Sequence, residues 1–236
     1  MKLQTYLRSA LTLGAIILFS TFAVAQSKKD FNLSGFNEIE MSSAFIVDIS
    51  QGNSYKVSVE AEREEDLNDL EVKIKGKRLV ASYKNNSGWS WGKNRKRVHF
   101  TITLPDLKAL DFSGATRSKV WGFNDLEYLK VTYSGASHSE LNLNADKIVF
   151  DISGASNVTL KGKGGIMKLE ASGASKFNAL EFSTKDADLD VSGATSVRVN
   201  AQKSLNVEAS GASSVRYIGT PSVRSDVSGA SSVKSE

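Results

Sequence analysis

Six acidic residues recur at one fixed place in the sequence, each two residues before a copy of the tetrapeptide Ser-Gly-Ala-(Ser/Thr). They are Asp111, Asp151, Glu170, Asp190, Glu208 and Asp226, and Thr132 takes this place in one further copy. A column of carboxylates can bind a cation or the hydroxyl groups of a sugar, and two carboxylates in unlike environments can hydrolyse a glycosidic bond. Like charges about 5 Å apart repel each other by roughly 1 kcal/mol in water, so such a column requires neighbouring cations.

Cations are available on both sides of these acids. Lys130, Lys168 and Arg224 stand two residues before the acid position, and a basic row, Arg198, Arg216 and Lys234, lies beyond the tetrapeptide. These cations favour an ordinary solvated surface. A cation-binding or sugar-binding stripe is the alternative, whereas a catalytic pair is disfavoured because such uniform repeats offer no contrast between two carboxylates.

A second candidate binding segment combines indole rings with positive charge. It contains Trp89, Trp91, Lys93, Arg95, Lys96 and Arg97. Between two predicted strands it forms a loop, where the rings could stack on sugars and the cations could contact anionic polysaccharide or lipid headgroups. The alternative is that both Trp side chains cover the end of the core while the charges stay solvated.

Other chemistry finds little support in the sequence. The chain has no Cys, which excludes disulfides, thiol catalysis and a lipid anchor on Cys. It also lacks His/Cys metal spacing, a phosphate-binding Gly loop and the Gly-Gly-x-Gly-x-Asp calcium repeat. His99 and His138 are interpreted as structural. We therefore predict no catalytic, cofactor-binding or metal-binding residue.

Residues 1–25 have the pattern of a cleaved signal peptide. Lys2 and Arg8 precede an apolar run over residues 11–22, and Ala23-Val24-Ala25 is a small-residue cleavage signature. We expect export to the periplasm, the outer surface or the medium, without a lipoprotein anchor or a membrane span. Cleavage lowers the formal charge from +4 to +2, which gives no reason to expect a nucleic-acid partner.

The tetrapeptides themselves predict the architecture. Their first residues lie 21, 19, 19, 20, 18 and 18 positions apart, and each copy contributes one Gly: Gly114, Gly135, Gly154, Gly173, Gly193, Gly211 and Gly229. Apolar residues alternate before and after each copy, which predicts two short strands beside a glycine corner. Winding one repeat per coil buries these strands in a single-stranded parallel β-helix, right-handed by preference and left-handed as the alternative. We expect each Gly to adopt positive φ, each adjoining Ala to point inward, and the flanking hydroxyls to stack.

The N-terminal portion, residues 26–107, predicts irregular strands that continue into the repeats over residues 108–236, so that 31–236 form one domain. We expect strands over 44–49, 55–61, 70–74, 79–83 and 98–104, with one helical turn inside the acidic stretch 60–71. The last coil, around residues 233–236, presents a sheet edge that could join two copies of the chain.

The β-rich segment after the leader, the Leu104-Pro105 closure and the reiterated Ser-Gly-Ala-Ser corners resemble a bacterial family common in Bacteroidetes. This is the "putative auto-transporter adhesin, head GIN domain" family, and the resemblance covers residues 31–236. It implies a right-handed β-helix of the pectate-lyase-like class and supplies no catalytic motif. We expect a non-enzymatic, adhesin-like protein without cofactors that binds a glycan or another cell-surface component. The alternatives are a β-helical enzyme acting on acidic polysaccharide and a structural envelope protein that self-associates.

Overall fold

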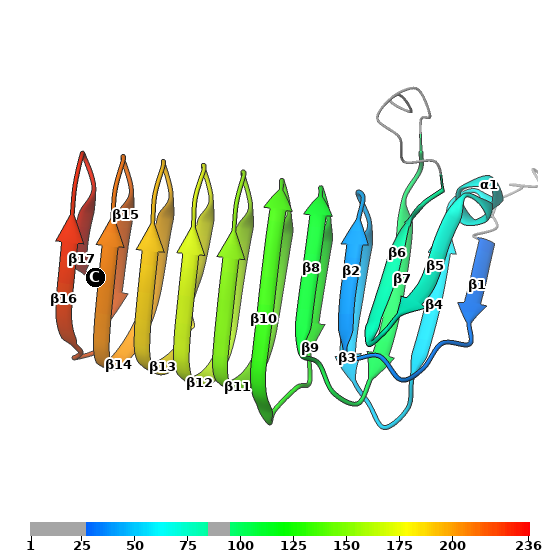
Figure 1. Cartoon of the computed structure of the whole chain (residues 1–236), viewed down its shortest axis with the longest axis horizontal. Coiled ribbons are helices and arrows are strands. Elements are labelled where there is room, and N and C mark those ends of the chain that lie inside the picture. The colour runs from blue at the N-terminus through cyan, green and yellow to red at the C-terminus, as the bar shows by residue number, and fades with distance from the viewer. Residues whose placement is uncertain (1–26, 85–94) are drawn as a thin grey trace, which may run out of the picture.

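A computed structural model describes residues 27–84 and 95–236 of the chain. In that part of the chain, hydrogen bonds connect 17 strands into one sheet, and one short helix, α1 (Glu64–Asn68), lies near the N-terminal end (Figure 1). The predicted signal peptide, residues 1–25, and Trp89, Trp91 and Lys93 lie outside the described residues.

The N-terminal strands are β1 (Ser27–Phe31), β2 (Glu38–Ser42), β3 (Ile46–Gln51), β4 (Lys56–Ala61), β5 (Leu70–Lys75), β6 (Arg78–Tyr83) and β7 (Val98–Leu104). The repeats form β8 (Ala109–Gly114), β9 (Arg117–Trp121), β10 (Leu126–Gly135), β11 (His138–Ile152), β12 (Asn157–Ala171), β13 (Lys176–Val191), β14 (Ser196–Ala209), β15 (Ser214–Ile218), β16 (Ser222–Val227) and β17 (Ser232–Ser235). All five strands predicted before the repeats and the helical turn within 60–71 are confirmed.

The repeats wind into a β-solenoid of about seven turns over residues 109–235, as the sequence predicts. Each coil rises along one strand, turns at a glycine corner, descends along a second strand and passes through a lower corner into the next coil. In Figure 1 the near strands run upward and each coil advances toward the C-terminal end, which makes the coil right-handed. We call the surface formed by strands before the glycine corners the ascending face, and the surface formed by strands after them the descending face.

The glycines form a column along one edge of the solenoid. All seven have positive φ, between +68° and +93°. A Cβ on Gly154 would lie 2.4 Å from the carbonyl oxygen of Gly135, and that oxygen accepts a hydrogen bond from Ala155 N at 2.8 Å. Stacking therefore leaves no room for a side chain here, independently of the φ requirement.

The orientation of the corner Ala differs from the prediction. These alanines are exposed, and the Ser or Thr that follows is buried in the first six corners and partly buried, as Ser231, in the last. The reason is the hydrogen bonding of the corner: Ser175 Oγ donates to Gly154 O at 3.2 Å and to Ser172 O at 3.3 Å, while Ser156 N donates to Ser175 Oγ at 3.4 Å. An inward hydroxyl satisfies carbonyl groups that an inward Ala would leave unpaired.

The interior is made of stacked apolar columns, as predicted from the alternation. Val131 lies in register with Leu110 and Phe150, and Phe150 with Leu169. These residues belong to one continuous core that also includes the interior of the N-terminal portion. Ser118 and Ser139 interrupt one column that is otherwise apolar, and their hydroxyl oxygens lie 2.6 Å apart.

Two further coils precede the repeats. Strands β2 and β3 pair in parallel with β8 and β9, so Ser42-Ser43-Ala44 forms a corner with Ser43 in the place of Gly. Strands β6 and β7 pair in parallel with β2 and β3 on the other side. Beyond them the pairing becomes antiparallel, in the order β7, β4, β1, with β5 against β6. This antiparallel layer covers the N-terminal end of the core (Figure 1).

Candidate functional site

The predicted carboxylates form a column on the ascending face. Asp151 pairs in register with Glu170, Glu170 with Asp190, Asp190 with Glu208, and Glu208 with Asp226. Thr132 separates Asp111 from Asp151, and Glu40 of the preceding coil extends the column beyond Asp111. The prediction missed Glu40 because its coil lacks the tetrapeptide.

Neighbouring cations partly neutralise this column. Arg78 lies 3.0 Å from the carboxylate of Glu40, a member of the column, and 2.9 Å from that of Glu38 beside it. Lys168 pairs instead with Asp188, which stands in the adjacent column two residues before Asp190, at 3.3 Å. Burial, with the adjacent charge of Glu40, raises the pKa of the Asp111 carboxyl above its ordinary value. Among the described residues, the column is therefore ion-paired at Glu40, and its other acids form no ion pair with a described residue.

The segment predicted to bind through Trp and basic residues is described only at its C-terminal flank. Arg95 is not a free cation there: its guanidinium lies 3.5 Å from the centre of the Tyr83 ring, and its Nη2 lies 2.8 Å from Asp69 Oδ2. The Arg95 side chain is only 17% exposed. Lys96 and Arg97 are exposed. The structure thus gives Arg95 an anchoring position and leaves its two neighbours at the surface.

A buried carboxylate holds the same flank. Asp66 of α1 accepts hydrogen bonds from Arg63 Nε at 2.8 Å and from Lys96 N at 3.2 Å. Burial acts to raise the pKa of Asp66, but these hydrogen bonds and the nearby guanidinium groups outweigh it and hold the pKa below its ordinary value. Burial also raises the pKa of Tyr83 to about 12. This cluster fastens the entry to β7 onto α1.

The two histidines lie on the descending face, apart from the carboxylate column. His99 Nε2 lies 2.9 Å from Asp48 Oδ2. His138 is exposed and stands in register between Arg117 and Asn157. Among the described residues, neither histidine forms a hydrogen bond to a hydroxyl group that it could activate as a nucleophile. In the described ranges no group of His, Cys, Asp and Glu is arranged to hold a metal ion.

The residue with the clearest binding character was missed by the sequence reasoning. Trp121, at the end of β9, is 43% exposed and stands in register between Ser50 and Asn142 on the descending face. It borders a shallow groove of about 200 Å³. The other residues of this groove are Lys119, Val120, Glu140, Leu141, Asn142, Thr159 and Lys161. The alternation of buried Ser118 and Val120 already places Trp121 outward, which is the signal that could have found it.

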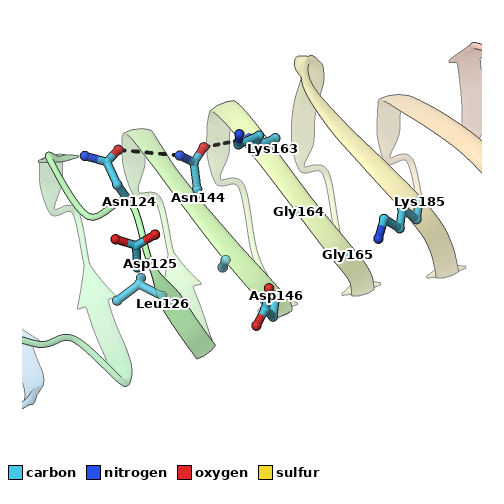
Figure 2. Close-up of a pocket in the computed structure, with 10 residues that line it drawn as sticks. Asn124, Asp125, Leu126, Asn144, Asp146, Lys163, Gly164, Gly165 and Lys185 are labelled. Atoms are coloured by element: carbon cyan, nitrogen blue, oxygen red, sulfur yellow. Dashed lines mark hydrogen bonds between the residues drawn. The ribbon is translucent and has the colours of Figure 1, made fainter.

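A larger groove, of about 350 Å³, lies along the lower corner (Figure 2). Asn144 Nδ2 donates to Asn124 Oδ1 at 3.5 Å, and Lys163 N donates to Asn144 Oδ1 at 3.0 Å, so the amides form a ladder along its edge. Figure 2 shows Asp125 and Asp146 below this ladder. Because the amides satisfy one another, we interpret this groove as the outer side of a structural turn.

Similar structures confirm the fold. A crystal structure described as a putative adhesin from Bacteroides fragilis superposes with a TM-score of 0.78 at 18% identity, covering 89% of this chain and 97% of that chain. A putative adhesin from Parabacteroides distasonis reaches 0.68 at 18% identity, with 89% and 97% covered. A protein from the same species described as a putative lipid binding protein reaches 0.63 at 15% identity, with 89% and 96% covered. No curated protein matches the chain.

No helix of the described ranges has the length and apolar character needed to cross a bilayer. The family model described as "Putative auto-transporter adhesin, head GIN domain" matches residues 35–221. This match spans the antiparallel N-terminal layer except β1 and nearly all of the glycine-cornered coils, so the chain belongs to this adhesin-head family.

Proposed function

We propose that the protein is an exported, non-enzymatic adhesin that binds glycans through the outer surface of its solenoid. The observation that carries this proposal is the exposed indole of Trp121 on a flat sheet beside a shallow groove. A sugar ring presents an apolar face that packs on an indole, and its hydroxyl groups need polar partners around the ring. Asn142 and Glu140 line the groove and supply an amide and a carboxylate, and Lys161, paired with Glu181 at 2.9 Å, adds an exposed ammonium group.

The shape of the surface also favours binding over catalysis. Sheet faces expose side chains at regular intervals and provide an extended platform, whereas glycoside hydrolysis requires two carboxyl groups placed across a substrate. The carboxylates of the ascending face are stacked along one column instead of facing each other. The family's adhesin description and the predicted leader support an exported location.

A glycan array probed with the purified protein tests the proposal. Trp121→Ala is expected to weaken binding roughly tenfold or more, because a stacked ring is lost. Tyr128→Ala is the matched control: Tyr128 is 40% exposed but lies on the ascending face. The double variant Trp89→Ala/Trp91→Ala examines the predicted loop separately. Absence of binding to every glycan would refute the proposed function, and release of reducing sugars or unsaturated products from polysaccharide would refute its non-enzymatic character.

Self-association is a second candidate, favoured by the last ascending strand. Val223 and Val227 of β16 are 39% and 41% exposed, and among the described strands only β14 pairs with β16. Antiparallel pairing of β16 with its copy, centred on Ser225, would place Arg224 opposite Asp226 and Val223 opposite Val227. Light scattering over a range of concentrations should then show a dimer that Ser225→Pro abolishes. A monomer at all concentrations would exclude this candidate.

A further inference from the structure

One column of the descending face changes its charge along the solenoid. Its members, in register, are Asp48, Lys119, Glu140, Thr159, Asn178, Arg198, Arg216 and Lys234. Acidic and basic residues alternate near the N-terminal end, where Trp121 stands two residues beyond Lys119. The last three positions are all basic. We call Arg198, Arg216 and Lys234 the basic column.

Stacking like charges in this way is unfavourable unless an anion lies beside them. Neighbouring parallel strands are about 4.8 Å apart, so each cation repels the next. Only Arg198 has a partner, since its guanidinium contacts the carboxylate of Glu236 and its side chain is 37% exposed. Arg216 and Lys234 are exposed and form no ion pair with a residue that the structure describes.

A column of hydroxyl groups runs beside the basic column. Ser196, Ser214 and Ser232 are in register with one another, two residues before Arg198, Arg216 and Lys234 respectively. Ser196 is exposed, and Ser214 and Ser232 are partly exposed. Each coil therefore presents one cation and one hydroxyl at the same relative position, and this pair repeats with the spacing of the coils. A ligand that matches it must carry one anionic group per repeat unit.

We infer that the basic column binds an acidic glycan that carries a carboxylate on each sugar, with its chain lying along the solenoid axis. The ~4.8 Å rise from coil to coil is short beside the reach of Arg and Lys side chains, so each carboxylate that projects toward this face lies within reach of a cation. The serine hydroxyls donate to the same carboxylates or to sugar hydroxyls. The same face continues to Trp121, which packs on a ring further along the chain. This inference rests on the proposed glycan-binding function and specifies its ligand class.

The contrast between the two faces supports a polyanion over a neutral ligand. In the same coils the ascending face carries Glu170, Asp190, Glu208 and Asp226 against two cations, Lys168 and Arg224. The descending face carries Lys176 and the basic column against Glu181 and Glu236, so the two faces differ in the sign of their net charge. A polyanion is repelled by one face and attracted by the other, so charge alone directs it to the descending face. The interaction is electrostatic and exposed, and it must weaken as salt increases.

Binding of the purified protein to immobilised polygalacturonate, compared with its fully methyl-esterified form, tests the inference. The esterified polymer keeps the sugar backbone but has no charge. We expect binding to the acidic polymer only, with Arg216→Gln/Lys234→Gln weakening it roughly three- to thirtyfold, as two exposed ion pairs are lost. Lys168→Gln/Arg224→Gln is the matched control, because it removes the same charge from the ascending face. Arg216→Lys/Lys234→Arg should retain binding, and an unchanged urea midpoint shows that each variant is folded.

The outcomes are distinguishable. Equal loss in both Gln pairs would show attraction by net charge alone and overturn the inference. Equal binding of the esterified polymer, or array binding restricted to neutral glycans, would overturn the acidic ligand class while leaving the proposed function intact. Absence of any glycan binding would remove both. Binding to anionic lipid vesicles without binding to the polymer would assign the basic column to a membrane surface. Concentration-dependent dimers lost in Arg216→Gln/Lys234→Gln would assign it to a second copy.

Discussion

Replacing a glycine of the corner column with alanine should destabilise the protein by two separable effects. At Gly173, φ is +83°, and a Cβ would lie 2.4 Å from Gly154 O. That oxygen cannot easily withdraw, because Ala174 N donates to it at 2.8 Å and Ser175 Oγ at 3.2 Å. The positive φ costs roughly 1–2 kcal/mol for a residue with a Cβ, and the overlap adds about 1–3 kcal/mol. We expect Gly173→Ala to lower the free energy of unfolding by about 2–5 kcal/mol.

Two other glycines separate the backbone effect from the steric one. Gly76 has a φ of +64° and no atom within 4 Å of the added Cβ, so Gly76→Ala should cost only about 1 kcal/mol. Gly114 has a φ of +88°, but its Cβ would stay at least 3.4 Å from Ser43, so Gly114→Ala should resemble Gly76→Ala. Urea unfolding followed by circular dichroism gives all three values by linear extrapolation. A loss for Gly173→Ala within about 0.5 kcal/mol of that for Gly76→Ala would refute the stacking argument.

Three further predictions follow from buried or partly buried polar groups. The folded-state pKa of Asp66 lies below its ordinary value, so ionised Asp66 stabilises the protein at neutral pH, and this stabilisation is lost as pH falls below 3.8. In urea titrations, Asp66→Asn should therefore lower the free energy of unfolding by about 1–3 kcal/mol at pH 7 and leave it unchanged at strongly acidic pH. The folded-state pKa of Asp111 is raised, so its ionised form opposes folding. Asp111→Asn should therefore increase the free energy of unfolding at pH 7, and the increase should vanish as pH falls toward 3.8. A decrease at pH 7 would contradict this reasoning. Ser139→Val should cost about 1–3 kcal/mol, because the Ser118 hydroxyl loses its partner and the buried Tyr133 hydroxyl loses a polar neighbour. In thermal unfolding, Ser118→Val/Ser139→Val should recover most of that loss only when Tyr133→Phe is added, because the double variant leaves the Tyr133 hydroxyl without either serine.

The repeats could be predicted because their physics is local. Alternation places Leu110, Val131 and Phe150 inward from sequence alone, and stacking identical repeats brings them into register. The coil formed by β2 and β3 could not be found in the same way, since Ser43 replaces the glycine that marks each corner of the repeats. The parallel pairing of β6 with β2 joins residues about forty positions apart, and no local pattern specifies it.

The functional surface was harder to predict than the fold. The carboxylate column was visible because one residue type recurs at one position. Trp121 occurs once, so no repetition draws attention to it, and only its outward place in the alternation of β9 distinguishes it from a core Trp. At the corners, the predicted bonding of the flanking hydroxyls to backbone groups is confirmed, whereas the predicted inward Ala was wrong. The small size of Ala does not decide its orientation, because the carbonyl groups of the corner require the hydroxyl on the inner side.

The coils differ in length, and the structure absorbs the difference at one edge only. Register shifts occur between Thr159 and Lys161, between Ala179 and Ser183, and between Thr184 and Asp186, all in the passage from descending to ascending strands. The opposite edge keeps its glycine column without interruption. During evolution, insertions, deletions or duplications can therefore change the number of residues at the lower edge, between descending and ascending strands, while the glycine edge stays constant. It follows that the lower edge, where the register shifts occur, is the place to insert a foreign loop into the solenoid without disturbing its core.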